Sequence, residues 1–116
     1  MITPTRIADA ETRRSLRLFL AKVTARYPVR DTYLFGSRAR GDFRADSDAD
    51  LAILLRDQPG AFLETKLSLA DIAYDVLLET GIRIQPLPVW EEEWAHPETY
   101  SNPQLLLNIR REGIRL

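Results

Sequence analysis

The segment from Asp50 to Leu55, which reads DLAILL, constrains the fold of this chain more than any other stretch, because it is apolar at nearly every position. A strand with apolar side chains on both faces is covered on both sides, so we expect this segment to be a central strand. The chain has 116 residues, which suits one domain over residues 1–116 with one core. The segment therefore predicts a sheet at the centre of that core.

Periodic segments on either side of this strand predict the remaining elements. Helices are predicted over Asp9–Tyr27, over Ser37–Arg40, from after a turn at Asp57–Gly60 to Glu79, and from Ser101-Asn102-Pro103 to Gly113. Strands are predicted over Thr32–Phe35 and Ile82–Val89. Pro86 and Pro88 each remove a ladder donor, so the last strand should lie at a sheet edge or end early. The order α-β-α-β-α-β-α predicts an α/β (α+β) domain with a small mixed sheet flanked by helices.

Apolar stripes predict which side of each long helix is buried. In the first helix the stripe consists of Leu16, Phe19, Leu20, Val23 and Tyr27. In the helix ending at Glu79 the expected stripe consists of Leu63, Leu67, Ala70, Ala73 and Leu77. Trp90 and Trp94 are four residues apart and can share one helix face as core anchors.

Composition excludes several classes of protein. Hydrophobic residues make up 45% and charged residues 28%, which is typical of a globular protein. No apolar stretch approaches the roughly 20 residues that cross a bilayer, and the start does not resemble a secretory signal. The chain has no cysteine, so we expect a cytoplasmic protein, and its one histidine, His96, argues against an all-protein zinc centre. A net charge of −1 does not indicate direct binding to nucleic acid.

Two aspartates precede the central strand at alternate positions. Residues i and i+2 of a strand share one face and lie about 6.6 Å apart, so Asp48 and Asp50 should point the same way. Paired carboxylates can hold a divalent cation such as Mg²⁺ or Mn²⁺, which serves in nucleotidyl displacement. The bland alternative is that Asp46, Ser47 and Asp48 form a solvated turn.

The Gly36-Ser37 pair lies where a strand ends and a short helix begins. Such a turn exposes backbone N–H groups that bind anions, and the missing side chain at Gly36 lets a phosphate approach the backbone. The Ser37 hydroxyl adds a donor, and Arg38 and Arg40 follow within reach. A pocket that binds phosphate on one side and a metal ion on the other can hold a nucleoside triphosphate such as ATP.

The combination of Gly36-Ser37, ten residues, and then Asp48-Ala49-Asp50 resembles the signature of the DNA polymerase β-like nucleotidyltransferase superfamily. The fuller string LFGSRARGDFRADSDADLAIL and the C-terminal IRREGIRL resemble its minimal nucleotidyltransferase (MNT) branch. The resemblance implies a nucleotide site at Gly36, Ser37 and Arg40 and a catalytic metal site at Asp48 and Asp50. MNT proteins are commonly antitoxins that modify HEPN-domain toxins, which are ribonucleases, on tyrosine.

One position departs from the pattern that the resemblance implies. Active members of the superfamily carry a third carboxylate on the neighbouring strand, and the residue that aligns with it here is Gln85, which is neutral and cannot act as a base. Three explanations stay open. Asp48 and Asp50 alone bind the metal in a slow or one-metal enzyme, another acid (Asp46, Asp75 or Glu91) replaces the missing one, or catalysis has been lost. Pro86 also suggests a local departure of the backbone.

Three functions are consistent with these residues. The first is a nucleotidyltransferase antitoxin that transfers AMP from ATP–Mg²⁺ to a hydroxyl of a HEPN-type toxin, in a hetero-oligomer. The second is an impaired nucleotide-binding module that neutralises its partner by occlusion, which Gln85 favours. The third and weakest is a regulatory nucleotide sensor.

Overall fold

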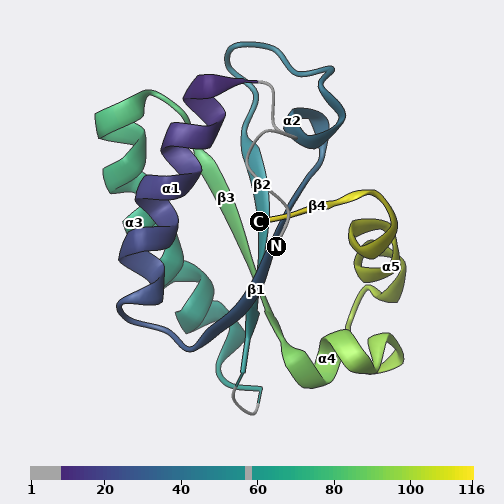
Figure 1. Ribbon diagram of the computed structural model, residues 1–116. Helices are drawn as coiled ribbons and strands as arrows, with labels where there is room; N and C mark the ends of the chain where they lie inside the picture. Colours follow the sequence, from purple (N-terminus) through teal and green to yellow (C-terminus); the bar gives the residue numbers. More distant parts are fainter. Residues whose placement is uncertain (1–8, 57–58) are drawn as a thin grey trace.

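The computed structural model describes residues 9–56 and 59–116, so part of the predicted Asp57–Gly60 turn lies outside the described residues. Its main elements are α1 (Ala10–Thr24), β1 (Val29–Phe35), α2 (Ser37–Arg40), β2 (Ala49–Leu55), α3 (Phe62–Thr80), β3 (Ile84–Trp90), α4 (Glu91–Ala95), η2 (Pro97–Thr99), α5 (Pro103–Glu112) and β4 (Ile114–Arg115). Helices α1 and α3 cover one face of the sheet, and α4 and α5 lie on the other (Figure 1).

The strands form one mixed sheet in the order β3-β2-β1-β4. Strand β2 pairs antiparallel with β1 and parallel with β3, which confirms that the DLAILL segment is central. Strand β3 is an edge strand, as predicted from Pro86 and Pro88, and both prolines keep their register with β2. A proline without a donor costs little where no further strand needs one. The predicted mixed sheet flanked by helices is therefore confirmed.

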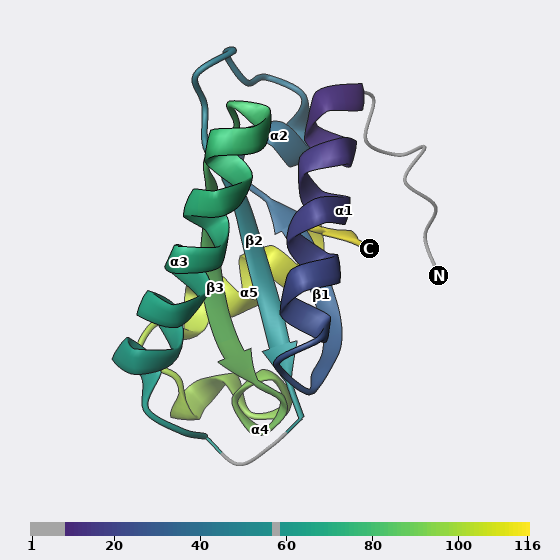
Figure 2. The same ribbon diagram turned by 90° about the vertical axis from the view of Figure 1, so that its left-hand side faces the viewer.

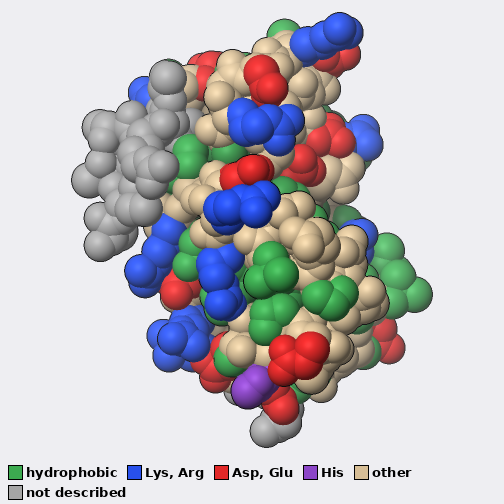
Figure 3. Space-filling model, turned by 90° about the vertical axis from the view of Figure 1, so that its right-hand side faces the viewer, with side chains coloured by type: hydrophobic (Ala, Val, Ile, Leu, Met, Phe, Trp, Pro, Cys, Tyr) green, Lys and Arg blue, Asp and Glu red, His purple; other side chains and the backbone are tan. Residues whose placement is uncertain are grey.

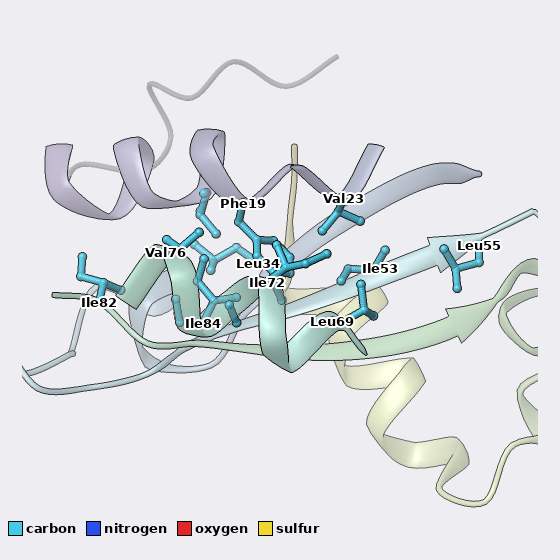
Figure 4. Packing of buried hydrophobic residues seen from close by; sticks show 14 of the residues in the cluster. Phe19, Val23, Leu34, Ile53, Leu55, Leu69, Ile72, Val76, Ile82 and Ile84 are labelled. Carbon is cyan, nitrogen blue, oxygen red and sulfur yellow. The ribbon is translucent and has the colours of Figure 1, made fainter. Parts of the chain in front are cut away.

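Alternation along β2 divides the core into two layers. One layer joins the sheet to α1 and α3, and its buried members from the strands include Leu34, Leu51 and Ile53. Figure 4 shows side chains of α1 and α3 meeting those of the strands in this layer. The other layer joins Ala52 and Leu54 to α5 and the end of β3. Side chains of β2 at even numbers, Asp50 included, therefore face the α5 side of the sheet.

Of the stripe that the sequence predicted for α3, only Ala73 is buried. The buried residues are Leu69, Ile72, Ala73 and Val76. Leu63 and Leu67 are 65% and 57% exposed, and Ala70 is exposed as well. Because α3 is apolar over most of its surface, two stripes compete for the core, and only packing against α1 and the sheet selects one. Figure 2 shows α1 and α3 side by side on this face of the sheet.

Three short elements were not predicted, namely α4, η2 and β4. Trp90 ends β3 and provides the N-cap of α4, so Trp90 and Trp94 do not share a helix face. Strand β4 has two residues, too few for a periodic pattern, and it pairs with β1. Within the described residues, no helix is both long and apolar enough to cross a bilayer.

Candidate active site

The sequence-predicted site residues meet at the end of the sheet where β1 ends and β2 and β3 begin. Phe35 of β1 pairs with Asp50 of β2, and Asp50 pairs with Gln85 of β3. Helix α2 and the loop of residues 41–48 lie at this end (Figure 1). Phe35 and Gln85 are 50 positions apart in the chain, yet both pair with Asp50. The sheet therefore brings distant segments together at this end.

Gln85 lies directly beside the aspartate pair, which agrees with its alignment to the position of the third acid. Its amide Nε2 donates a hydrogen bond to Asp48 Oδ2 at 3.0 Å. This contact also shows that Asp48 and Gln85 point to the same side of the sheet. Pro86 does not displace the strand, since Leu51 pairs with Pro86 in the same parallel register. The site thus has a neutral amide where a carboxylate would complete it.

Gly36 has a backbone conformation that only glycine adopts easily. Its φ is 77° and its ψ is −158°, and it is the N-cap of α2. A Cβ built at Gly36 would collide with the carboxylate oxygen Oδ2 of Asp50. The missing side chain therefore leaves room for the Asp50 carboxylate.

The electrostatic environment of Asp50 is that of a crowded acid. Burial and the neighbouring Asp48 charge raise the pKa of Asp50 above its ordinary value of 3.8, and the Arg40 charge opposes this rise. Arg40 is largely exposed and forms an ion pair with Asp42, in which Nε and Oδ2 are 3.3 Å apart. Two neighbouring carboxylates repel each other when both are ionised, so a cation placed between them stabilises the doubly charged pair.

Arg38 does not reach the phosphate turn as the sequence suggested. Its side chain is 2% exposed and lies between α1 and the loop of residues 41–48. It is the buried residue of α2, whereas Arg40 at the end of the same helix is exposed. Sequence reasoning missed this role because two arginines separated by one residue look alike until the helix has a buried side.

The acids considered as replacements for the third carboxylate lie elsewhere. Asp46 is exposed in the loop before the site, and Asp75 is exposed on α3, on the opposite face of the sheet. Glu91 follows the far end of β3 and pairs with Arg30, with Nη1 and Oε2 at 3.1 Å. Asp75 and Glu91 therefore do not lie beside Gln85.

The oxygen ligands at this site are of the kind that a hard divalent cation prefers, but only two of them are negatively charged. Asp48 and Asp50 offer carboxylate oxygens, and the side-chain oxygen of Gln85 is a neutral oxygen donor on the next strand, which suits Mg²⁺ or Mn²⁺. Among residues 9–56 and 59–116, no group of three or more acidic, histidine or cysteine side chains is placed to hold a metal ion. A cation here would rely on two carboxylates and on the oxygens of a bound phosphate.

The α5-side face of the molecule is polar near the site and apolar below it. Figure 3 shows acidic and basic side chains interspersed in the upper half of this face, with hydrophobic side chains and the single histidine lower down. A cavity of about 200 Å³ lies at the β3 edge on the other side of the sheet, between α3 and β3, and it is lined by Tyr74, Leu77, Arg83 and Gln85 among others.

Removing the Asp50 charge is expected to stabilise the metal-free protein. Because the pKa of Asp50 is raised in the folded state, ionisation opposes folding once the pH rises above the ordinary value of 3.8. Asp50→Asn should therefore melt higher than wild type at pH 7 in EDTA, by up to a few degrees, and the difference should shrink towards about pH 3. Thermal unfolding followed by circular dichroism measures this, with the exposed Asp46→Asn as the control. A lower melting temperature for Asp50→Asn at pH 7 would mean that the carboxylate is structural.

Comparisons with known proteins point to one family. The sequence profile of the family described as "Nucleotidyltransferase domain" matches residues 16–104. No curated protein sequence matches the chain significantly. Among solved structures, a chain from a toxin–antitoxin with AMP-PNP has a TM-score of 0.60 at 17% identity, covering 92% of this chain and 72% of that one. A chain from a mutant toxin–antitoxin MntA–HpeT has a TM-score of 0.57 at 18% identity, covering 90% and 70%. At these identities the likeness concerns the fold.

Proposed function

Because the chain belongs to the nucleotidyltransferase domain family, we propose that it transfers AMP from ATP to a hydroxyl group of a protein partner, as the antitoxin of a toxin–antitoxin pair. The observation that carries this proposal is that the Asp50 carboxylate lies against the glycine turn at Gly36, while Gln85 pairs with Asp50 and donates a hydrogen bond to Asp48. Acidic oxygens and a side-chain-free backbone turn meet at one point of the surface, as a metal-bound triphosphate requires.

Each residue has a distinct part in the proposed reaction. Asp48 and Asp50 would hold Mg²⁺ or Mn²⁺, which when bound supplies charge neutralisation for the triphosphate. The Gly36 and Ser37 backbone N–H groups have no acceptor within α2, because they begin the helix, and they would donate to phosphate oxygens. Arg40 would neutralise charge on the departing pyrophosphate. As the acceptor oxygen bonds to the α-phosphorus and pyrophosphate leaves, the hydroxyl must lose its proton, and because Gln85 cannot accept it, the proton would pass to solvent water.

Two observations favour a protein as the acceptor. The similar solved structures are of toxin–antitoxin pairs, one of them with AMP-PNP. Helix α3 also exposes large hydrophobic side chains, namely Phe62, Leu63, Leu67, Tyr74 and Leu78, at 39–70%. A run of exposed apolar side chains on one helix is the kind of surface that protein partners cover. We infer a toxin of the HEPN class, the partner that the resemblance to MNT proteins implies, in a hetero-oligomer.

The second candidate function is neutralisation of the same partner by occlusion, without nucleotide transfer. The hydrogen bond between Gln85 and Asp48 favours it, since the amide takes the place of an acid and ties up one aspartate oxygen. The two candidates share the partner and differ in whether the partner becomes modified.

Intact mass of the partner distinguishes the two candidates. A HEPN-type toxin that forms a complex with this chain is incubated with wild-type protein, ATP and Mg²⁺, and a gain equal to one AMP is expected on the toxin. Asp48→Asn/Asp50→Asn should reduce the modified fraction by at least about 10²-fold, because both metal ligands are removed. Asp46→Asn, which changes an exposed acid in the same loop, serves as the control.

The outcomes separate clearly. A tight complex with no gain in mass from wild-type protein supports occlusion and contradicts transfer. Equal transfer by wild type and by the double variant would show that Asp48 and Asp50 are not the metal ligands.

A further inference from the structure

Arg38 is the most deeply buried charged side chain that the candidate mechanism does not use. Its side chain is 2% exposed, against 53% for the side chain of Arg40 two residues later. A buried guanidinium is costly unless nearly all of its N–H groups find acceptors. In this structure every nitrogen of Arg38 donates a hydrogen bond.

The acceptors of Arg38 come from two separate parts of the chain. In the loop of residues 41–48, Nε donates to the Ser47 carbonyl at 2.9 Å and Nη2 to the Ala45 carbonyl at 3.1 Å. In α1, Nη1 donates to Thr12 Oγ1 at 2.9 Å and lies 3.4 Å from Asp9 Oδ2. The guanidinium thus joins the loop to the start of α1.

Further contacts make this junction rigid. The Arg38 guanidinium carbon lies 4.5 Å from the centre of the Phe43 ring, so the loop also covers one face of the arginine. Asp9 caps α1 by accepting from the Thr12 backbone N–H at 2.8 Å. The hydrogen bond from the Thr12 hydroxyl lowers the pKa of Asp9, with a contribution from the Arg38 charge, so Asp9 remains an anion beside the guanidinium.

We propose that Arg38 is a positioning residue, which fixes the loop of residues 41–48. The loop then leads into β2 with the carboxylate of Asp48 beside the carboxylate of Asp50 and the amide of Gln85. The Ser47 carbonyl that it holds belongs to the peptide bond that leads into Asp48. A loop carbonyl held 2.9 Å from a buried guanidinium cannot rotate without breaking that bond. This inference rests on the proposed metal and nucleotide site, because its consequence is the geometry of that site.

The prediction is a loss of metal-dependent nucleotide affinity when the planar fork of Arg38 is removed. Lysine keeps the charge, but its single nitrogen cannot reach both loop carbonyls and Thr12. Arg38→Lys is therefore expected to fold, and to lose about tenfold of the gain in ATP affinity that Mg²⁺ confers, since residues that orient metal ligands typically contribute 10- to 100-fold. Calorimetry of ATP binding in Mg²⁺ and in EDTA gives this ratio. A purely structural arginine would lower the melting temperature and leave the ratio unchanged.

Arg110 offers a matched control. Its guanidinium also bonds to a backbone carbonyl, that of Trp94, and lies 4.6 Å from the Trp94 ring centre, but it is exposed on α5. Arg110→Gln should keep the ratio within about twofold of wild type. Hydrogen–deuterium exchange provides a readout independent of any ligand, and Arg38→Lys should exchange faster than wild type at residues 42–48 while the β2 amides stay protected.

The results decide the two ideas separately. A wild-type protein whose ATP affinity does not depend on Mg²⁺ would defeat the proposed metal site, and the exchange data would still report on the loop. Unchanged exchange at residues 42–48 in Arg38→Lys, or a folded Arg38→Lys or Arg38→Gln with the wild-type affinity ratio, would overturn the positioning role. If Arg38→Gln does not fold, Arg38→Lys alone is decisive.

Discussion

Replacing Gln85 with an acid is expected to increase nucleotide transfer by about 10²- to 10⁴-fold, the range typical of a positioned general base. Gln85→Glu keeps the length of the side chain and exchanges an amide for a carboxylate. Its oxygen would lie where Nε2 now lies, 3.0 Å from Asp48 Oδ2. That carboxylate would add a third charge to the metal site and an acceptor for the hydroxyl proton. The measurement is the rate of AMP transfer to the partner protein.

The same substitution should change stability in opposite directions without and with metal. In EDTA, a third carboxylate beside Asp48 and Asp50 adds like-charge repulsion, so Gln85→Glu should melt lower than wild type. Saturating Mg²⁺ should reverse the order, because a cation that binds the folded state more tightly stabilises it more. A domain of this size shifts by roughly 4 °C for about 1 kcal/mol, so both effects are measurable. Gln104→Glu on α5, an exposed glutamine paired with Asn108, is the control for an added charge.

Gln85→Asp, whose side chain is one methylene shorter, tests how far the carboxylate must extend from β3 towards the metal site. If only Gln85→Asp transfers AMP, the native protein is an enzyme that has lost its activity, and the carboxylate must lie closer to the β3 backbone than the carboxylate of glutamate does. Unchanged transfer together with unchanged Mg²⁺ stabilisation in both variants would show that position 85 is outside the metal site.

Gly36→Ala is expected to abolish Mg²⁺-dependent ATP binding, with a loss of at least about 100-fold. The added Cβ would collide with the Asp50 carboxylate, so either Asp50 or the turn must move. The φ of 77° adds strain, which typically costs about 1–3 kcal/mol of folding free energy for such residues. Calorimetry measures the binding, and chemical denaturation measures the stability.

Gly81→Ala tests a positive φ without a collision, although Gly81 has a ψ of 0° where Gly36 has −158°. Gly81 has a φ of 81°, close to that of Gly36, but a Cβ there meets no atom within 4 Å. Gly81→Ala should therefore cost stability from strain alone and leave ATP affinity unchanged.

A double-variant cycle then tests whether Asp50 is the obstacle. In an Asp50→Ala background the carboxylate is gone, so adding Gly36→Ala should cost less stability than it does in wild type. Strictly additive effects would show that the two residues do not meet. Normal ATP binding by a folded Gly36→Ala would exclude the turn from the nucleotide site.

Local patterns in the sequence were sufficient to predict most of the elements. Gly41, Gly81 and Gly113 each follow the last residue of a helix, as predicted, because a helix end is specified by the few residues around it. The edge position of β3 followed from Pro86 and Pro88, since a missing donor is a property of the residue itself. Asp48 and Asp50 both lie beside Gln85, although Asp48 precedes β2, so strand alternation alone did not place its side chain. The roles assigned to these aspartates remain predictions.

Long-range packing decided the features that local patterns left ambiguous. Helix α3 carries two apolar stripes, and contact with α1 and the sheet selected the one with Leu69 and Ile72 rather than the one with Leu63 and Leu67. The two-residue β4 exists only because the end of the chain returns to β1. Such choices depend on which surfaces meet, and no window of adjacent residues contains that information.

The candidate site shows the same division. Gln85 was aligned with the missing acid from the sequence, but its hydrogen bond to Asp48 required β2 and β3 to pair in parallel register. The inward turn of Arg38 required α1, α2 and the loop to enclose it. The sequence was enough to identify side chains that can bind metal or phosphate, because this chemistry belongs to each residue by itself. Proximity and burial were decided only by the tertiary structure, because they arise from segments that are distant in sequence and adjacent in space.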